Sequence, residues 1–390
     1  MSFLTKKKKV ILIVFGTRPE AIKLAPVIKR LESQNKYKVL ICLTAQHREL
    51  VDQVINYFNI KVDIDLNLMT KNQSLEVITA KILTSMSRIY YKYQPSLVVV
   101  HGDTTTTFAT SLSAFYNKIP IAHIESGLRT FNKLSPFPEE FNRLITSYLS
   151  TWHFAPTKIS KSNLLRENIN EKNILVTGNT IVDAVNLCVE KIEREQKTKN
   201  FIVNELLSVF PKFLSTQKYV LITCHRRENF GDNFKNILKI IEKLCTKFNF
   251  INFVFPRHLN PNMQPISSLN NIKNLYITEP MPYQNFIWLV KNCYFIITDS
   301  GGIQEEGATL KKPILILRSN SERPEVIDSG FAKLVGVDEE KIIDIFSKLI
   351  DNKSFYCQMS ENHNPFGNGT SSQKIIKFIE KNLKIISKLA

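Results

Sequence analysis

The chain has 390 residues, which is long for a single hydrophobic core and predicts two domains. Its composition, with 43% hydrophobic and 22% charged residues, is typical of a soluble globular protein. The formal net charge of +17 is compatible with an anionic partner, but the lysines are spread along the whole chain among Asn and Ile. No stripe of basic residues interleaved with aromatic ones occurs, so nucleic-acid binding is not expected.

The N-terminal segment resembles a signal peptide, because the lysines at 6–9 precede an apolar run at 10–15. That run is too short for a signal peptide and leads into GTRPE rather than a small-residue cleavage site, so it predicts a first strand. No apolar run approaches the length of a membrane span, and membrane insertion is not expected. The six cysteines form no CxxC pair, which indicates a reduced, cytoplasmic protein.

Short β-rich runs alternate with longer helical patterns along almost the whole chain. We expect strands at 10–15, 38–43, 97–100, 119–124, 174–176, 219–223, 252–255, 274–278, 294–298, 313–317 and 332–335. This alternation is typical of right-handed βαβ units and predicts an α/β fold of two Rossmann-like, doubly wound domains that face a cleft. The predicted domains are residues 1–178 and 179–370, and an amphipathic helix at 371–390 crosses back to the first.

Acidic residues follow successive strands in the first half. Asp103 follows the run at 97–100 and Glu125 the run at 119–124, while Glu139 and Glu140 come just after a proline-rich loop. The carboxyl ends of parallel strands lie at one edge of a sheet, so these acids should converge there. Crowded carboxylates near His101, His123 and Arg129 suit proton transfer, because like charges push neighbouring pKa values apart. The sequence therefore predicts an active site at this edge.

The first strand runs into the turn FGTRPEAIK, which is typical of an anion site. Gly16 allows a tight turn, and Arg18 and Lys23 flank the positive end of the helix that follows. Only one glycine is present, so the GxGxxG fingerprint of a dinucleotide cofactor is absent and no cofactor is expected.

The second half carries the run FIITDSGGIQEEGATL, in which a strand ends at Asp299. Ser300, Gly301 and Gly302 would let backbone N–H groups approach a diphosphate at the start of a helix near Ile303. The two acids at 305 and 306 are expected in the first helical turn, where one could accept hydrogen bonds from a ribose.

Three further strands of the second half end in cations, in TCHRREN, FPRHLNP and RSNSERPE, which include His225, His258 and Arg323. None has the spacing of a metal site, so no metal is expected. Asp63 and Asp65 are similar to the DxD motif of metal-dependent glycosyltransferases, but no phosphate loop accompanies them and a solvated turn is the better interpretation.

Taken together, the motifs resemble those of the non-hydrolysing UDP-N-acetylglucosamine 2-epimerases. They occur in order from about residue 10 to the C-terminus: FGTRPEAIK, TAQHRE, VHGDTTTT, HIESGLRT, PFPEEFNR, TGNT, CHRREN, HLNP, TDSGGIQEE, ERPE and NPFGNG. The resemblance implies a glycosyltransferase-B-like fold with a UDP-sugar in the cleft, and a homodimer. It also implies interconversion of UDP-GlcNAc and UDP-ManNAc, for bacterial surface polysaccharides, by elimination of UDP to a 2-acetamidoglucal and its re-addition.

The resemblance also implies site residues. Those matching the catalytic group are Asp103, Glu125, Glu139 and His225. Those matching the UDP-sugar site are Arg18, Lys23, His258, Phe286, Ser300, Gly301, Gly302, Glu306 and Arg323. Gln46 and His47 match a segment that contacts a second, activating UDP-GlcNAc in some members.

Three other functions remain open on the sequence alone. A hydrolysing epimerase would share these acids but release UDP and free ManNAc. A glycosyltransferase of the same fold would need an acceptor groove. A catalytically idle binder of UDP-sugars or nucleic acid is opposed by the presence of all the acids.

Overall fold

The structure, a computed structural model, describes residues 8–44, 48–68, 70, 73–210, 218–226, 229, 231–257, 269 and 271–389, with backbone alone at 48–49 and 385–389. Two compact units make up the chain: residues 1–184 with 366–390, and residues 185–365. The boundaries of these units differ by a few residues from the domain boundaries predicted at 178/179 and 370/371. The domain prediction also gave each domain a separate role, and those roles stay predictions.

Unit 1 is built on a seven-stranded sheet in the order β3-β2-β1-β4-β5-β6-β7, in which every pair is parallel. Its strands are β1 (Val10–Phe15), β2 (Lys38–Leu43), β3 (Ile64–Asp65), β4 (Leu97–His101), β5 (Ile121–Ile124), β6 (Trp152–Ala155) and β7 (Ile174–Val176). Its helices are α1 (Arg18–Ser33), α2 (Arg48–Tyr57), α3 (Leu75–Tyr93), α4 (Thr105–Tyr116), α5 (Glu139–Leu149), α6 (Lys158–Arg166), the 3₁₀ helix η1 (Glu171–Asn173), the start of α7 (Thr180–Arg194) as far as Ala184, and α15 (Ser371–Leu389). The rest of α7 belongs to unit 2.

Side chains of the central strands of unit 1 alternate between its two faces, as the two-residue repeat of a strand requires. On one face, alternate residues of β1, β2 and β4 pack with α3 and α4 around Ile82 and Met86. The strands are buried on both faces, which explains their nearly continuous apolar runs.

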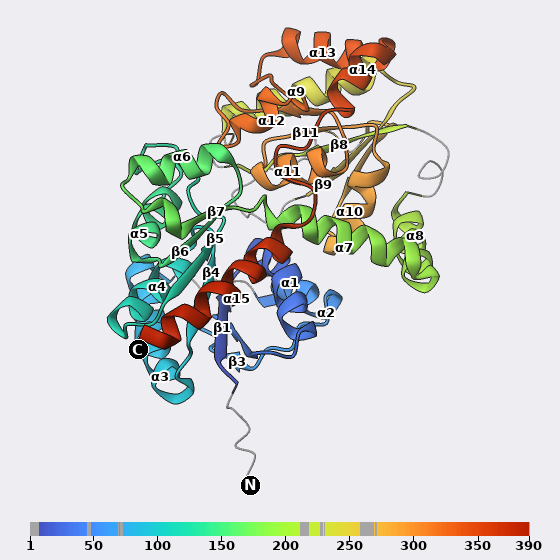
Figure 1. Cartoon of the computed structure of the whole chain (residues 1–390). Helices are drawn as coiled ribbons and strands as arrows, with labels where there is room; N and C mark the ends of the chain where they lie inside the picture. The colour runs from blue at the N-terminus through green and yellow to red at the C-terminus, as the bar shows by residue number, and fades with distance from the viewer. Residues whose placement is uncertain are drawn as a thin grey trace. The chain divides into compact units, whose positions relative to one another are not determined.

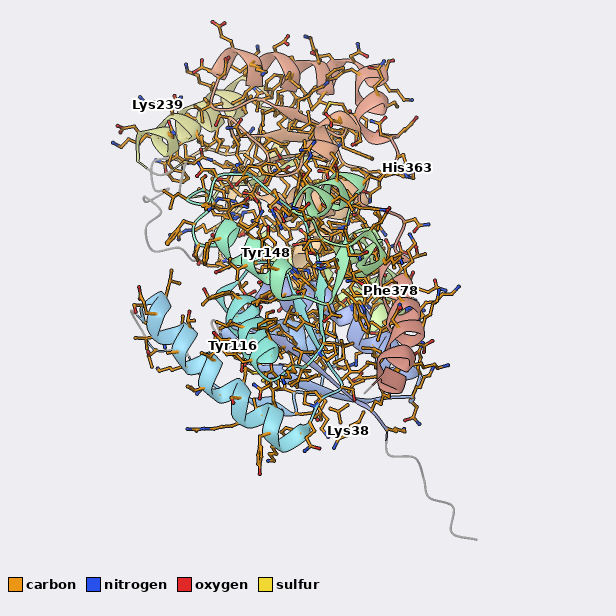
Figure 2. The ribbon with its side chains drawn as sticks, turned by 60° about the vertical axis from the view of Figure 1, so that its left-hand side comes forward. Lys38, Tyr116, Tyr148, Lys239, His363 and Phe378 are labelled. Atoms are coloured by element: carbon orange, nitrogen blue, oxygen red, sulfur yellow. The ribbon has the colours of Figure 1, made fainter. Side chains whose placement is uncertain are left out.

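Helix α15 returns to unit 1 from the far end of the chain and packs against α1 (Figure 1). On its apolar side Ile375, Ile376, Ile379 and Leu383 are buried. Phe378 of the same helix (Figure 2) packs edge-to-face on Trp152 and Phe154, with ring centroids 5.9 and 5.5 Å away. Asp183 of α7 accepts hydrogen bonds from the backbone N–H groups of Ser371 and Ser372, at 3.2 and 2.9 Å, and so caps this helix. The predicted C-terminal helix is therefore present and lies in unit 1.

Unit 2 is built on a six-stranded parallel sheet in the order β10-β9-β8-β11-β12-β13. Its strands are β8 (Tyr219–Thr223), β9 (Asn252–Pro256), β10 (Leu275–Thr278), β11 (Phe295–Thr298), β12 (Ile314–Ile316) and β13 (Ala332–Leu334). Its helices are α8 (Gln196–Val209), α9 (Asp232–Lys247), α10 (Tyr283–Asn292), α11 (Gly301–Thr309), α12 (Pro324–Asp328), α13 (Glu339–Asp351) and α14 (Lys353–Ser360).

In unit 2, too, side chains on one face of the sheet pack with the helices that cover it. Phe253 and Phe295 project from their strands onto Phe346 of α13, with ring centroids 5.7 and 4.9 Å from it. These rings belong to one cluster of buried residues that also includes the apolar face of α9. Aromatic pairs in offset and edge-on geometry stabilise such a layer beyond the area they bury.

The predicted α/β class, with two Rossmann-like units in a glycosyltransferase-B-like chain, is confirmed. All the predicted strands are present, but two strands of unit 1, β3 and β6, were not predicted. β3 has only two residues, and β6 is a four-residue run interrupted by His153. Among the described residues, no helix is both long enough and apolar enough to cross a membrane.

Candidate active site

The order of strands in unit 1 reverses between β1 and β4, which creates a topological switch point at the carboxyl edge of the sheet. Helix α1 begins just after β1, the GDTTTT loop follows β4, and Glu125 follows β5 immediately. Ligands of doubly wound sheets bind in the crevice outside such an edge. The predicted acids therefore occupy the part of this fold that most often carries chemistry.

Glu125 is nine-tenths buried and held by several partners. Its Oε2 pairs with the ammonium group of Lys23 on α1 and accepts a hydrogen bond from Asn179 Nδ2 at 2.7 Å. His101 Nε2 lies 3.9 Å from the same oxygen. The backbone φ of Glu125 is +65°, a left-handed conformation that non-glycine residues rarely adopt and that is often found at functional sites. The fold thus holds this carboxylate in a specific place.

Asp103 lies in the neighbouring loop, with 26% of its side chain exposed. One carboxylate oxygen pairs with Arg143 Nη2 at 2.7 Å, and its backbone carbonyl accepts a hydrogen bond from Asn142 Nδ2 at 3.0 Å. Glu139 begins α5 one turn before Arg143, and residues four apart share a face of a helix. Helix α5 therefore brings Glu139 to the side of α5 that meets Asp103.

Glu140 and Arg129, by contrast, stabilise the surrounding loops. Glu140 accepts hydrogen bonds from the backbone N–H groups of Thr130 and Phe131 at 2.9–3.1 Å. Arg129 makes a two-pronged ion pair with Glu167, with both N–O distances at 2.7 Å. We predicted that Arg129 lies beside the catalytic acids. In the structure, its guanidinium group instead binds Glu167.

The histidines of this edge are buried and neutral near pH 7. Burial lowers the pKa of His101 to about 4, against a smaller upward effect of Glu125. Burial likewise lowers the pKa of His123 to about 3, although its hydrogen bond to the Gly102 carbonyl acts in the other direction. Because a neutral ring carries one N–H and Gly102 O is an acceptor, His123 donates from Nε2, at 2.7 Å.

Unit 2 repeats the arrangement at its own switch point, between β8 and β11. Asp299 follows β11, is fully buried, and accepts hydrogen bonds from the backbone N–H groups of His225 and Arg226 at 2.9–3.0 Å. Asn229 Nδ2 donates to it at 2.9 Å and Cys224 Sγ at 3.2 Å. The His225 side chain, 24% exposed, is thereby presented at the edge of the sheet.

The SGG run begins α11 at Gly301, two residues earlier than predicted. The two acids at 305 and 306 are consequently in the second turn rather than the first. Among the described residues, a Cβ at Gly302 would meet no atom within 4 Å beyond its own helix backbone, whereas one at Gly301 would collide with the guanidinium group of Arg323. Gly302 thus opens onto free space beside the helix N-terminus, as a backbone-bound anion requires.

Arg323 is fixed by Glu305, whose Oε1 accepts a hydrogen bond from its Nε at 2.5 Å. Ser300 is the N-cap residue of α11, Glu306 is buried in the same helix, and Phe286 lies half-buried on α10. Arg18 is the first residue of α1 and is half-buried. The predicted residues Gln46, His47 and His258 lie outside the described residues.

Sequence reasoning missed Glu20, Arg143, Asn179 and the contacts of Asp299. The TRPE segment carries the S/T-x-x-E signal of a capping box, so a capping role for Glu20 could have been found. Nothing local to Arg143 or Asn179 marks either residue, because each meets its acid through the packing of the fold.

Comparison with known proteins gives matches along nearly the whole chain. The family model described as UDP-N-acetylglucosamine 2-epimerase matches residues 29–380. The protein named UDP-N-acetylglucosamine 2-epimerase from Neisseria meningitidis serogroup A is 48% identical, covering 95% of this chain and 99% of its own. The Campylobacter jejuni protein of the same name is 47% identical, over 96% and 98% of the two chains.

Two solved structures also superpose on this chain along nearly its whole length. The crystal structure of the Neisseria meningitidis enzyme bound to UDP-GlcNAc superposes with a TM-score of 0.90 at 48% identity, covering 95% of this chain and all of that one. A co-structure of S. aureus MnaA with UDP superposes with a TM-score of 0.86 at 40% identity, covering 97% and 98% of the two chains.

Proposed function

Because the chain belongs to the UDP-N-acetylglucosamine 2-epimerase family, we propose that it interconverts UDP-GlcNAc and UDP-ManNAc without releasing free sugar. The family predicted from the motifs is confirmed, and so is the enzyme class, an epimerase and hence an isomerase. The proposal adds the chemical route and the roles of the residues.

The hydrogen on carbon 2 of the sugar is not next to a carbonyl group, so direct removal from the ground-state sugar is difficult. When the bond from carbon 1 to UDP breaks, the bonding electrons leave with the diphosphate and the anomeric carbon becomes oxocarbenium-like. That positive charge acidifies the proton on carbon 2. A carboxylate removes the proton, the electrons of the C–H bond form the C1–C2 double bond, and 2-acetamidoglucal and UDP remain bound.

The return steps invert the centre. An acid on the opposite face delivers a proton to carbon 2, and the diphosphate oxygen of UDP bonds again to carbon 1. We assign the proton transfers to the group Asp103, Glu125 and Glu139, with His225 assisting. A positioned acid or base contributes about 10²–10⁴ in rate.

The observation that carries this proposal is the convergence of Asp103 and Glu125 at the switch-point edge of unit 1. They follow adjacent strands, and each has a cation within reach: Arg143 for one and Lys23 for the other. Each carboxylate is held at this edge by its cation. Such an edge can both take a proton from carbon 2 and return one.

The nucleotide would be held by unit 2. The helix N-terminus at Ser300, Gly301 and Gly302 offers backbone N–H groups for the diphosphate, with Glu306 for the ribose and Phe286 and Arg323 nearby in the same unit. Arg18 and Lys23 were assigned to the nucleotide from the motif. The ion pair between Lys23 and Glu125 adds a second role for this lysine, which is to hold the carboxylate in place.

The deciding experiment is epimerisation in D₂O. The elimination route passes the carbon-2 proton to carboxylates whose protons exchange with solvent, so the product should carry deuterium at carbon 2 by NMR. Separating UDP-ManNAc from free ManNAc in the same reaction distinguishes the proposed route from a hydrolysing epimerase. Full retention of the original hydrogen, or release of free ManNAc, would overturn the proposal.

We also propose a homodimer that works in the cytoplasm and supplies UDP-ManNAc for surface polysaccharides. Large aromatic side chains are exposed on neighbouring helices of unit 1: Tyr116 of α4 is 66% exposed and Tyr148 of α5 is 56% exposed (Figure 2). Exposed aromatic surface of this kind favours burial against a partner. All six cysteines are free thiols, which suits a reducing compartment. Light scattering of the purified protein gives its molar mass in solution, which tests whether it is a dimer.

A further inference from the structure

Glu20, on the first turn of α1, is buried at the switch point of unit 1 and connects two loops that are far apart in sequence. Its Oε2 accepts hydrogen bonds from the backbone N–H groups of Gly16 and Thr17, at 3.0 and 2.8 Å, and from Thr17 Oγ1 at 2.7 Å. Its Oε1 accepts from Thr104 Oγ1 at 2.7 Å, and Thr107 Oγ1 lies 3.2 Å from it. The loop after β1 is thus tied to the loop after β4.

A helix cap explains only half of these contacts. The capping box of α1 uses Oε2 and lies within residues 16–20. The contacts made by Oε1 reach to residues 104 and 107, and these residues form the N-terminus of α4. Thr104 directly follows Asp103, so the second oxygen of Glu20 restrains the residue next to a predicted catalytic acid.

The restraint continues through the loop. Thr104 caps α4 by accepting the backbone N–H of Thr107 at 3.2 Å, and Thr107 Oγ1 donates to the carbonyl of His101 at 2.6 Å. One flank of Asp103 is thus hydrogen-bonded to Glu20 through Thr104, and the other is held by Thr107, whose hydroxyl oxygen lies 3.2 Å from Glu20. On the same helix, one turn later, Lys23 pairs with Glu125.

We propose that Glu20 is a positioning residue for the proton-transfer group: it holds Asp103 in register with Lys23 and Glu125 from the first turn of α1. The inference rests on the proposed function for its effect on turnover, and on the geometry alone for its effect on the loop. Glu20 is only 2% exposed, and a buried carboxylate held by hydrogen bonds from Gly16, Thr17 and Thr104 is a rigid link. Burial raises its pKa, and the bonds from the threonines and the backbone partly offset that rise.

Glu20→Ala removes the link, and Glu20→Gln is the conservative variant. The carbonyl oxygen of Gln can still accept the N–H groups of Gly16 and Thr17, while its amide group donates to the hydroxyl oxygens of Thr104 and Thr107. We expect kcat to fall about 10- to 100-fold in Glu20→Ala, because displacement of a catalytic group by about 1 Å can cost that much. KM should stay within about twofold, and Glu20→Gln should keep most of the activity.

The test joins kinetics to a measurement that needs no turnover. Amide hydrogen exchange at residues 102–107 should rise about tenfold or more in Glu20→Ala. Thr157→Ala, which removes a threonine cap from α6 in the same unit, should leave that exchange and kcat unchanged.

In a Thr104→Val background, where the main cross-loop bond is already lost, Glu20→Ala should lower kcat much less than it does in wild type. All variants are assayed at a temperature at which circular dichroism shows each to be folded.

The outcomes separate the two proposals. Failure of wild type to epimerise would count against the proposed function, and the exchange measurement would still decide the role of Glu20. Unchanged exchange at 102–107 in Glu20→Ala would overturn the positioning role. Equal losses of kcat in the wild-type and Thr104→Val backgrounds would also overturn it, since an independent structural defect gives additive effects.

Discussion

The carboxylate of Asp299 accepts the backbone N–H of His225, with that nitrogen 3.0 Å from each of its oxygens. Two backbone N–H groups, the Asn229 amide and the Cys224 thiol donate to this carboxylate, and His225 Nδ1 lies 3.8 Å from its Oδ1. The backbone position of His225 is therefore fixed by an acid at the end of another strand.

Asp299→Asn should displace His225, because one oxygen is replaced by an NH₂ group that faces donors. We expect a loss of about 1–3 kcal/mol in the free energy of unfolding, and a fall in kcat of at least about tenfold. Urea unfolding and steady-state kinetics measure the two effects. Asn229→Ala, which removes one donor and keeps the carboxylate, should do less; if Asp299→Asn did no more than that variant, the explanation would be wrong.

Removing charge from the predicted acids should stop the chemistry while the fold survives. Asp103→Asn, Glu125→Gln and Glu139→Gln keep the volume of each side chain, and each should lower kcat by about 10²–10⁴. Glu171→Gln is a suitable control, because that carboxylate is 68% exposed and pairs with Lys161. Near-normal rates in all three variants would remove the proposed site.

The buried pair of Lys23 and Glu125 should be visible in stability as well as in rate. Both side chains are less than a tenth exposed, so Lys23→Met leaves a buried carboxylate without its cation and should cost about 3–5 kcal/mol. Adding Glu125→Gln should recover part of that loss. The exposed pair of Lys348 and Asp344 gives the matched control, and Lys348→Met should cost less than about 1 kcal/mol. Comparable losses for the two lysines would contradict a buried pair.

Gly302 offers a test of the diphosphate site that spares the fold. Among the described residues, a Cβ at this position meets no atom within 4 Å beyond its own helix backbone, so valine should change the melting temperature of the free protein little. UDP at a hundred times its dissociation constant should stabilise wild type by about 2.7 kcal/mol and Gly302→Val far less. Gly301→Ala, in contrast, should perturb Arg323 even without ligand. An unshifted melting curve of wild type in saturating UDP would refute the assignment.

The buried histidines predict how stability changes with pH. The folded pKa of His123 is about 3 and that of His101 and His153 about 4, all below the unfolded value of 6.5. Between these limits the unfolded state binds more protons, so stability falls as pH drops from 6.5 towards 4. Each histidine adds at most about 1.4 kcal/mol per pH unit.

His123→Gln isolates one of these contributions, because its amide can still donate to the Gly102 carbonyl but does not titrate in this range. The free energy of unfolding in urea, measured at several pH values from 7 to 4, should depend less steeply on pH in this variant. A slope equal to that of wild type would show that His123 is not buried as a neutral ring.

The strands could be read from the sequence wherever a parallel strand is buried on both faces. β1, β4 and β11 are such uninterrupted apolar runs, and each was predicted within a residue or two. β6 has the polar His153 in the middle of four residues and β3 has only two residues, so neither stands out from its surroundings. Tertiary pairing makes them strands.

The site could be predicted as a set of strand ends but not as a set of contacts. Asp103 and Glu125 were found because residues after parallel strands must share an edge. Their partners come from 39 to 102 positions away: Lys23 and Asn179 for Glu125, and the Asn142 that holds the Asp103 backbone. No local pattern encodes such pairs, since they depend on how α1, α5 and α7 pack.

The return of α15 to unit 1 has a consequence for how the protein is made. The chain leaves unit 1 after Ala184 and re-enters it at Phe366, so the ribosome synthesises all of unit 2 before the last helix of unit 1 emerges. Until then, Trp152 and Phe154 lack the cover of Phe378, and Asp183 lacks the two serine N–H groups that it binds. A nascent chain therefore exposes the apolar surface that α15 will cover through nearly half of its translation. A premature stop codon anywhere before the final helix would leave that surface exposed in the finished protein.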